Sequence, residues 1–113
     1  MVESVGLSEK VSRELESLLA TIRSDPSVRS IILFGSTALG TNTEQSDIDL
    51  LILVDSPTAL TVLTPAAIRV AAYGLVTFPL DMIVETVAEF EERKPFPTLE
   101  RKIAREGKVL YAA

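Results

Sequence analysis

The sequence predicts a single α/β (α+β) domain in which helices cover at least one face of a small β-sheet. Its 113 residues fit one domain, 1–113, and 47% of them are apolar, which is enough for one hydrophobic core. Charged residues make up 24%, as in ordinary globular domains. Segments with the period of an amphipathic helix alternate along the chain with short, β-branched apolar runs. This alternation predicts the class.

The strands are predicted from apolar runs of strand length that end at glycine, serine or proline. Val28–Phe34 is rich in β-branched residues and stops at Gly35, and 47–54 stops at Ser56-Pro57. The predicted strands are 28–34, 47–54, 80–85 and 108–111.

The helices are predicted from apolar spacing and from capping residues. Between 7 and 23, leucines, valine and isoleucine recur on one helix face, with Ser8 as a cap and Asp25-Pro26 as a stop. Pro65 suits the first turn of another helix, and Thr98 caps the last one. The predicted helices are 7–23, a short one after Gly35 that ends at Gly40, 65–74, a turn at 89–93, and 99–106, with a polar loop at 41–45 and an ambiguous stretch at 57–64.

Two missing residue types narrow the possible chemistry. The chain has no cysteine and no histidine, which excludes disulfides, thiolate or imidazole metal sites, and imidazole acid–base catalysis. Its net charge of −5 disfavours direct binding to nucleic acid. The amino terminus has no targeting pattern, and no apolar run approaches the roughly 18 residues of a spanning helix, so we expect a cytoplasmic protein without membrane association.

The most informative segment is Gly35-Ser36, followed after ten residues by Asp47-Ile48-Asp49. In a strand, residues i and i+2 lie on the same face with Cα atoms roughly 6.6 Å apart, so Asp47 and Asp49 are neighbours. Two adjacent carboxylates repel each other, and a shared Mg²⁺ relieves the repulsion. Taken alone, such a pair is more often a solvent-facing acidic pair at the start of a strand.

Three further residues strengthen the functional interpretation. Gly35 ends a buried strand, where a missing side chain lets a ligand approach the backbone. Ser36 offers a hydroxyl and an N–H at the start of a short helix, where phosphate oxygens bind well. Asp81 lies inside an apolar strand and needs a partner. The alternatives for Asp81 are a salt bridge to Arg69 or Lys94, or exposure on an edge strand.

These residues resemble the signature of the nucleotidyltransferase superfamily that has the DNA polymerase β catalytic fold. The carrying segments are GlySerThrAlaLeuGly at 35–40, SerAspIleAspLeu at 46–50, AspMetIleValGluThr at 81–86 and IleAlaArgGluGlyLysValLeuTyr at 103–111. The likeness is greatest to the minimal nucleotidyltransferases (MNT) of prokaryotes and covers about 10 to 112. It implies a mixed rather than fully parallel sheet.

The resemblance also implies an activity and a site. It implies Mg²⁺-dependent transfer of a nucleoside monophosphate, AMP from ATP, to an acceptor hydroxyl, with two Mg²⁺ held by Asp47, Asp49 and Asp81. Asp81 would also help to deprotonate the acceptor, and Gly35 and Ser36 would bind the β- and γ-phosphates. In the minimal group the usual partner is a helical HEPN protein, often a toxic RNase, to which the nucleotidyltransferase is the antitoxin. We therefore expect a hetero-oligomer or a homo-oligomer.

The sequence departs from the family at one position and leaves the mode of action open. Many minimal members carry arginine where this chain has Leu39, and 36–46 contains no lysine or arginine. Arg29, Arg69 or a residue of the partner could supply that charge. The basic cluster in 101–108 is a solvated helix face or a partner surface. The alternatives to an AMP-transferring antitoxin are an antitoxin that acts by docking alone and a nucleotidyltransferase for a small molecule such as an aminoglycoside.

Overall fold

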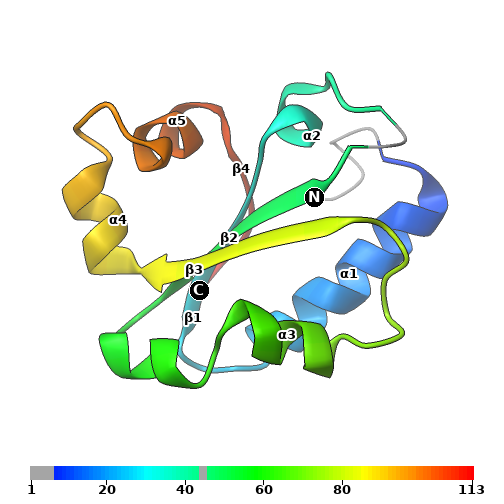
Figure 1. Cartoon of the computed structure of the whole chain (residues 1–113), viewed down its shortest axis with the longest axis horizontal. Coiled ribbons are helices and arrows are strands. Elements are labelled where there is room, and N and C mark those ends of the chain that lie inside the picture. Colours follow the sequence, from blue (N-terminus) through cyan, green and yellow to red (C-terminus); the bar gives the residue numbers. More distant parts are fainter. Residues whose placement is uncertain (1–6, 44–45) are drawn as a thin grey trace.

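A computed structural model describes residues 7–43 and 46–113, and its centre is a four-stranded sheet in the order β3-β2-β1-β4 (Figure 1). Strands β1 and β2 are antiparallel, as are β1 and β4, whereas β2 and β3 are parallel. The sheet is therefore mixed, which confirms the prediction. The strands are β1 (Val28–Phe34), β2 (Ile48–Val54), β3 (Leu80–Thr86) and β4 (Lys108–Ala112).

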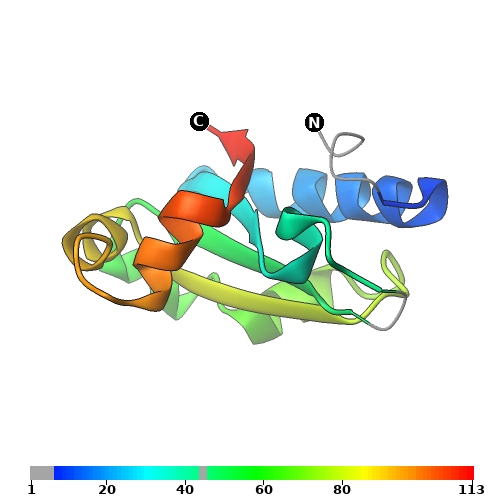
Figure 2. The same cartoon turned by 90° about the horizontal axis from the view of Figure 1, so that it is seen from above.

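Helices cover both faces of this sheet. Seen from above in Figure 2, α5 and α2 lie over the sheet and α3 lies beneath β3. No helix in the described part of the chain is long and apolar enough to cross a membrane. The helices are α1 (Glu9–Arg23), α2 (Ser36–Leu39), the 3₁₀ helix η2 (Pro57–Thr61), α3 (Pro65–Ala71), α4 (Val87–Arg93) and α5 (Leu99–Glu106).

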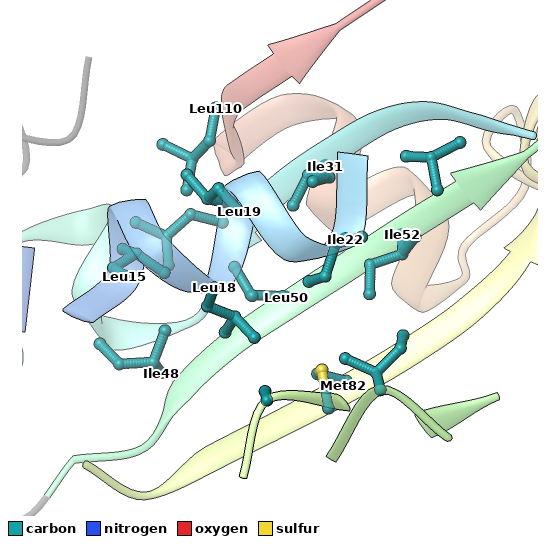
Figure 3. Close-up of a cluster of buried hydrophobic side chains, with 14 of the residues drawn as sticks. Leu15, Leu18, Leu19, Ile22, Ile31, Ile48, Leu50, Ile52, Met82 and Leu110 are labelled. Atoms are coloured by element: carbon teal, nitrogen blue, oxygen red, sulfur yellow. The ribbon is translucent and has the colours of Figure 1, made fainter. Parts of the chain in front are cut away.

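The main core fills the space between one face of the sheet and helices α1 and α3. Figure 3 shows the leucines of α1 packed on alternate residues of β2, including Leu50 and Ile52. The residues between them, Leu51 and Leu53, face the other way and form a smaller core with Phe90 of α4 and Ile103 of α5. β2 is therefore apolar on both faces, which is why its sequence is a continuous apolar run.

Most predicted boundaries are confirmed within two residues. The side chains of Ser8, Thr86 and Thr98 cap α1, α4 and α5 by accepting a backbone hydrogen bond. α4 is a full helix from Val87 where the sequence predicted one turn at 89–93, because the Thr86 side chain caps it by accepting a hydrogen bond from the N–H of Glu89. The ambiguous stretch forms η2, and of the predicted loop 41–45, residues 44 and 45 lie outside the described residues.

The predicted end of the helix that begins at Pro65 was wrong. α3 ends at Ala71 rather than near Gly74, and the chain leaves it through a tight turn. The N–H of Leu75 bonds to the carbonyl of Ala72 at 2.9 Å, and Gly74 has a φ of 82°, a left-handed conformation that glycine adopts without strain. Gly74 thus belongs to the turn after the helix, not to its cap.

Candidate active site

Two of the predicted site carboxylates lie side by side in the sheet. In the parallel pairing of β2 with β3, Asp49 is directly opposite Asp81. On the other side of β2, Asp49 pairs with Phe34, the last residue of β1. Asp47 comes two residues before Asp49, just outside the strand. The fold therefore brings all three carboxylates to one end of the sheet, although Asp81 is far from the others in sequence.

These carboxylates share the sheet face that α4 and α5 partly cover. Asp49 alternates with Ile48 and Leu50, which point into the core under α1, so its side chain lies on the opposite face. The same alternation places Asp81 on that face, two residues before Ile83, which packs against the smaller core. Asp49 is half-buried, while Asp47 and Asp81 are exposed. The site formed by Asp47, Asp49 and Asp81 is thus an open ledge, a solvent-exposed surface at the edge of the smaller core.

Gly35 lies against the carboxylate of Asp49. It has a φ of 75° and a ψ of −159°, a conformation that is almost confined to glycine. A Cβ at Gly35 would lie well under 3.0 Å from Oδ2 of Asp49, so no other residue fits unless the carboxylate moves. Here the requirement for glycine comes both from the backbone and from the space that Asp49 occupies.

The charge on Asp49 is poorly compensated. Burial raises the pKa of Asp49 above its usual value, and the neighbouring charges of Asp81 and Asp47 raise it further. In the described part of the chain, no lysine or arginine forms an ion pair with any of the three. A divalent cation would offset this repulsion.

The donor set fits Mg²⁺ held together with a nucleotide. Mg²⁺ is typically bound by one or two carboxylates and by phosphates of the substrate. Among the described residues, no group of three such side chains is placed to hold a metal ion by itself. With a nucleotide bound, one or two of these aspartates could be ligands, and phosphate oxygens and water would supply the rest.

Ser36 begins α2 directly beside this ledge. Gly35 gives α2 no side-chain cap, so the first N–H groups of this short helix are not satisfied by a capping side chain. The helix ends at Gly40, where the N–H of Thr41 bonds to the carbonyl of Ser36 at 3.0 Å. The turn thus places Gly35 against Asp49, with Ser36 as the next residue in the chain.

The basic residues considered for the phosphate charge lie elsewhere or have other partners. Arg29 pairs with Asp55 at 3.7 Å, at the opposite end of β1 from the site, so the suggestion that it neutralises phosphate was wrong. Arg69 donates through Nη2 to the carbonyl of Leu80 at 2.8 Å, beside Asp81 but not paired with it. Leu39 is 52% exposed and contributes no charge.

The possible structural partners of Asp81 do not bind it. Lys94 forms its ion pair with Glu91, on α4, and Arg69 is held by the backbone of Leu80. Asp81 is instead exposed on β3, an edge strand, which was the second alternative for this residue. Its position opposite Asp49 is what links it to the site.

Sequence reasoning missed a lysine beside the glycine turn, which we define as Gly35 and Ser36 at the end of β1. A cavity of about 150 Å³ lies between α5 and the end of β1, and its lining includes Gly35, Phe34 and Lys102. In the sequence, Lys102 is one of several basic residues in 101–108, and no local pattern places it next to Gly35. Only the packing of α5 against β1, through Ile103 and Ile32, sets this position.

A second missed feature is a buried carboxyl pair at the other end of β3. Glu85 is 7% exposed and Glu100 of α5 is 8% exposed, and Arg93 Nη1 lies 3.4 Å from Glu100 Oε2. Burial and hydrogen bonding with Glu100 raise the pKa of Glu85 to about 7. Burial opposes ionisation of Glu100, but hydrogen bonds from its own N–H, Glu85 and Arg93 lower its pKa. Glu89 pairs with the same arginine at 3.5 Å.

The chain is similar in sequence or fold to several known proteins. The chain is 37% identical over 86 residues to a "putative protein adenylyltransferase" of Methanocaldococcus jannaschii, an alignment that covers 74% of this chain and 79% of that protein. Its fold is similar to that in a crystal structure of a toxin–antitoxin with AMP-PNP, with a TM-score of 0.59, 20% identity, and coverage of 94% of this chain and 75% of the other. It is also similar to the fold in a mutant of the toxin–antitoxin MntA-HpeT, with a TM-score of 0.58, 21% identity, and coverage of 88% and 72%.

The sequence model of the nucleotidyltransferase domain matches residues 13–111. This span contains Gly35, Ser36, the three aspartates and the whole sheet except the last residue of β4. The chain therefore belongs to the nucleotidyltransferase domain family.

Proposed function

We propose that this chain transfers AMP from ATP to a hydroxyl group of a partner protein, in a reaction that depends on Mg²⁺. The observation that carries the proposal is the direct pairing of Asp49 with Asp81 beside Gly35, which places three carboxylates next to a glycine turn. Membership of the nucleotidyltransferase family supports the reaction class. The name of the M. jannaschii relative supports a protein as the acceptor.

The proposed roles follow from position and exposure. Asp47 and Asp49 would hold Mg²⁺, which when bound stabilises the attacking and leaving oxygens of the transfer. Gly35 and Ser36 would bind the β- and γ-phosphates through backbone N–H groups and the serine hydroxyl. These residues fix the triphosphate so that its α-phosphorus faces the acceptor.

Asp81 is the residue we place nearest to the acceptor. It is exposed on the edge strand, so a hydroxyl can reach it from outside the sheet. Asp81 would share in Mg²⁺ binding and accept the proton of the hydroxyl as its oxygen attacks the α-phosphorus. A new P–O bond forms, the bond to the β-phosphate oxygen breaks, and pyrophosphate leaves.

We infer that the acceptor protein is a helical, HEPN-type toxin and that this chain is its antitoxin. The fold similarity to two toxin–antitoxin structures, one of them with AMP-PNP, supports such a partner. In this proposal 1–113 acts as one minimal nucleotidyltransferase domain and works where ATP and Mg²⁺ are available, in the cytoplasm. The complex, rather than the chain alone, is the active unit.

Neutralisation by docking alone is the second candidate. The observation in its favour is the uncharged rim of the glycine turn, where Leu39 is exposed and α2 carries no lysine or arginine. A weak hold on the triphosphate would leave binding to the toxin as the main activity.

The test combines label transfer with toxin neutralisation. The purified chain is incubated with Mg²⁺, a HEPN-type candidate partner, and ATP labelled on either the α- or the γ-phosphate. We expect label on the partner only from α-labelled ATP, and none with the Asp49→Asn variant. Arg29→Gln, at the far end of β1, is the control and should transfer label as the wild type does. Neutralisation without any transfer would refute the enzymatic proposal and favour docking.

A further inference from the structure

We infer that Lys102 is a nucleotide-binding residue that supplies the positive charge missing from the glycine turn. This inference rests on the proposed function, since it concerns the same triphosphate. Lys102 lies on α5 and lines the cavity of about 150 Å³ whose wall on the sheet side is formed by Phe34 and Gly35. In Figure 1 both α5 and α2 lie near the end of β1, although Ala38 of α2 packs into the main core.

The cavity lies on the face of the sheet that also carries the side chain of Asp49. Phe34 and Ile103, which both line it, pack against the smaller core under α4 and α5. The carboxylate of Asp49 is on this face too, in the space where a Cβ of Gly35 would stand. A triphosphate bound at Gly35 would therefore lie beside a wall of this cavity, within the surroundings of Lys102.

Charge balance gives Lys102 a reason to bind there. The site holds three aspartates, and an ATP triphosphate adds further negative charge that Mg²⁺ only partly offsets. α2 provides no cation, and Arg69 is tied to the carbonyl of Leu80. In the described part of the chain, Lys102 has no ion pair within 4.0 Å, so its ammonium group is available.

Glu106 places a negative charge in the same cavity and opposes phosphate binding there. It lies one turn further along α5 and shares the lining with Lys102. Its carboxylate competes with phosphate for the ammonium group and repels phosphate directly. Removal of Lys102 and removal of Glu106 should therefore have opposite effects on triphosphate binding. A purely structural role of this helix surface would not produce that pattern.

The experiment is calorimetric titration of the full chain with ATP, ADP and AMP in the presence of Mg²⁺. Arg105→Gln is the matched control, since it removes the same charge from the same helix and Arg105 does not line the cavity. We expect Lys102→Gln to weaken ATP binding at least about 10-fold, which corresponds to about 1.4 kcal/mol and suits a hydrogen bond to a charged group. Arg105→Gln and AMP binding should change less than about 3-fold, the range of a screened surface charge.

Two further variants sharpen the result. Lys102→Arg should restore most of the ATP affinity, and Glu106→Gln should increase it. Equal losses for ATP and AMP, or equal losses in Lys102→Gln and Arg105→Gln, would overturn the inference about Lys102 while the proposed function stands. A wild-type chain that binds no ATP with Mg²⁺, alone or with its partner, would overturn the proposed function itself.

Discussion

Replacement of Gly35 by alanine tests the central contact of the site, because it changes one methyl group at a defined place. Gly40→Ala is the matched control. Both glycines have a φ of 75° and flank the same short helix, but a Cβ at Gly40 meets nothing within 4 Å. At Gly35 the same atom would collide with Oδ2 of Asp49.

The expected magnitudes differ for this reason. Gly40 has a left-handed conformation, where alanine costs about 1–2 kcal/mol of unfolding free energy. Gly35 has a ψ of −159° and lies in a region that costs about 1–3 kcal/mol. The collision with Asp49 adds a coupling of about 0.5–3 kcal/mol, so we expect Gly35→Ala to lose about 1.5–6 kcal/mol in total.

A double-mutant cycle separates the collision from the backbone strain. Unfolding by urea is measured for Gly35→Ala, Asp49→Ala and the double variant, together with Gly40→Ala. Because Asp49→Ala removes the atom that the new methyl group meets, Gly35→Ala should cost at least about 1 kcal/mol less in that background. Mg²⁺-dependent ATP binding should be lost in Gly35→Ala and kept in Gly40→Ala. The assigned contact would be refuted if the effects of Gly35→Ala and Asp49→Ala on the unfolding free energy were additive. Equal ATP binding by Gly35→Ala and Gly40→Ala would refute it too.

The remaining predictions concern the carboxyl groups of Asp81, Asp49 and Glu85. Asp81→Asn should keep most of the Mg²⁺-dependent ATP binding, measured by calorimetry, but lose at least about 10²-fold in label transfer, the low end of a general-base contribution; residual transfer proportional to folded protein would indicate a structural role. Mg²⁺ and ATP together should raise the melting temperature of the wild type more than either ligand does alone. Asp49→Asn should lose that synergy, but without Mg²⁺ and ATP it should melt at a higher temperature than the wild type at pH 7. The pKa of Glu85 is raised to about 7, which adds stability that is complete below about pH 4.5 and is lost as the pH rises through 7. In urea unfolding the wild type should therefore be about 1–3 kcal/mol less stable at pH 8 than at pH 5, and Glu85→Gln should show little of this change. Equal pH dependence in the two proteins would refute the assignment.

The local sequence was sufficient for the elements and for part of the site. The apolar run of β2 and the caps Ser8 and Thr98 act within a few residues, so they could be read directly. Asp47 and Asp49 were visible as neighbours because the period of a strand is two residues. That Asp81 stands opposite Asp49 depends on the parallel register of β2 and β3, which no local pattern fixes; only the family resemblance linked them.

The parts that could not be predicted from local patterns depend on how α5 packs. The sequence shows Lys102, Glu100 and Glu106 as similar charged residues on one short helix. In the fold, Glu100 is buried against Glu85, whereas Lys102 and Glu106 line the cavity beside Gly35. The rotation of the helix, set by the contact of Ile103 with the smaller core, decides which role each residue has.

One group of unfavourable interactions lies at the end of the sheet where the chemistry is proposed, apart from the buried Glu85–Glu100 pair at the other end of β3. Ionised Asp49 is half-buried next to Asp81, and Gly35 keeps a conformation with space for it. A carboxyl group whose pKa is raised by folding stabilises the native state below its unfolded pKa, and this contribution is lost as the pH rises. At pH 7 without Mg²⁺ the charge on Asp49 therefore opposes folding, and an amide in its place removes that opposition. If the proposed function is correct, bound Mg²⁺ and nucleotide would reverse the sign, because they would interact favourably with the charged form of Asp49. The higher melting temperature expected for Asp49→Asn and its expected loss of ATP-dependent stabilisation thus have one cause, and observing the second without the first would show that the repulsion among the carboxylates is relieved by something other than the metal.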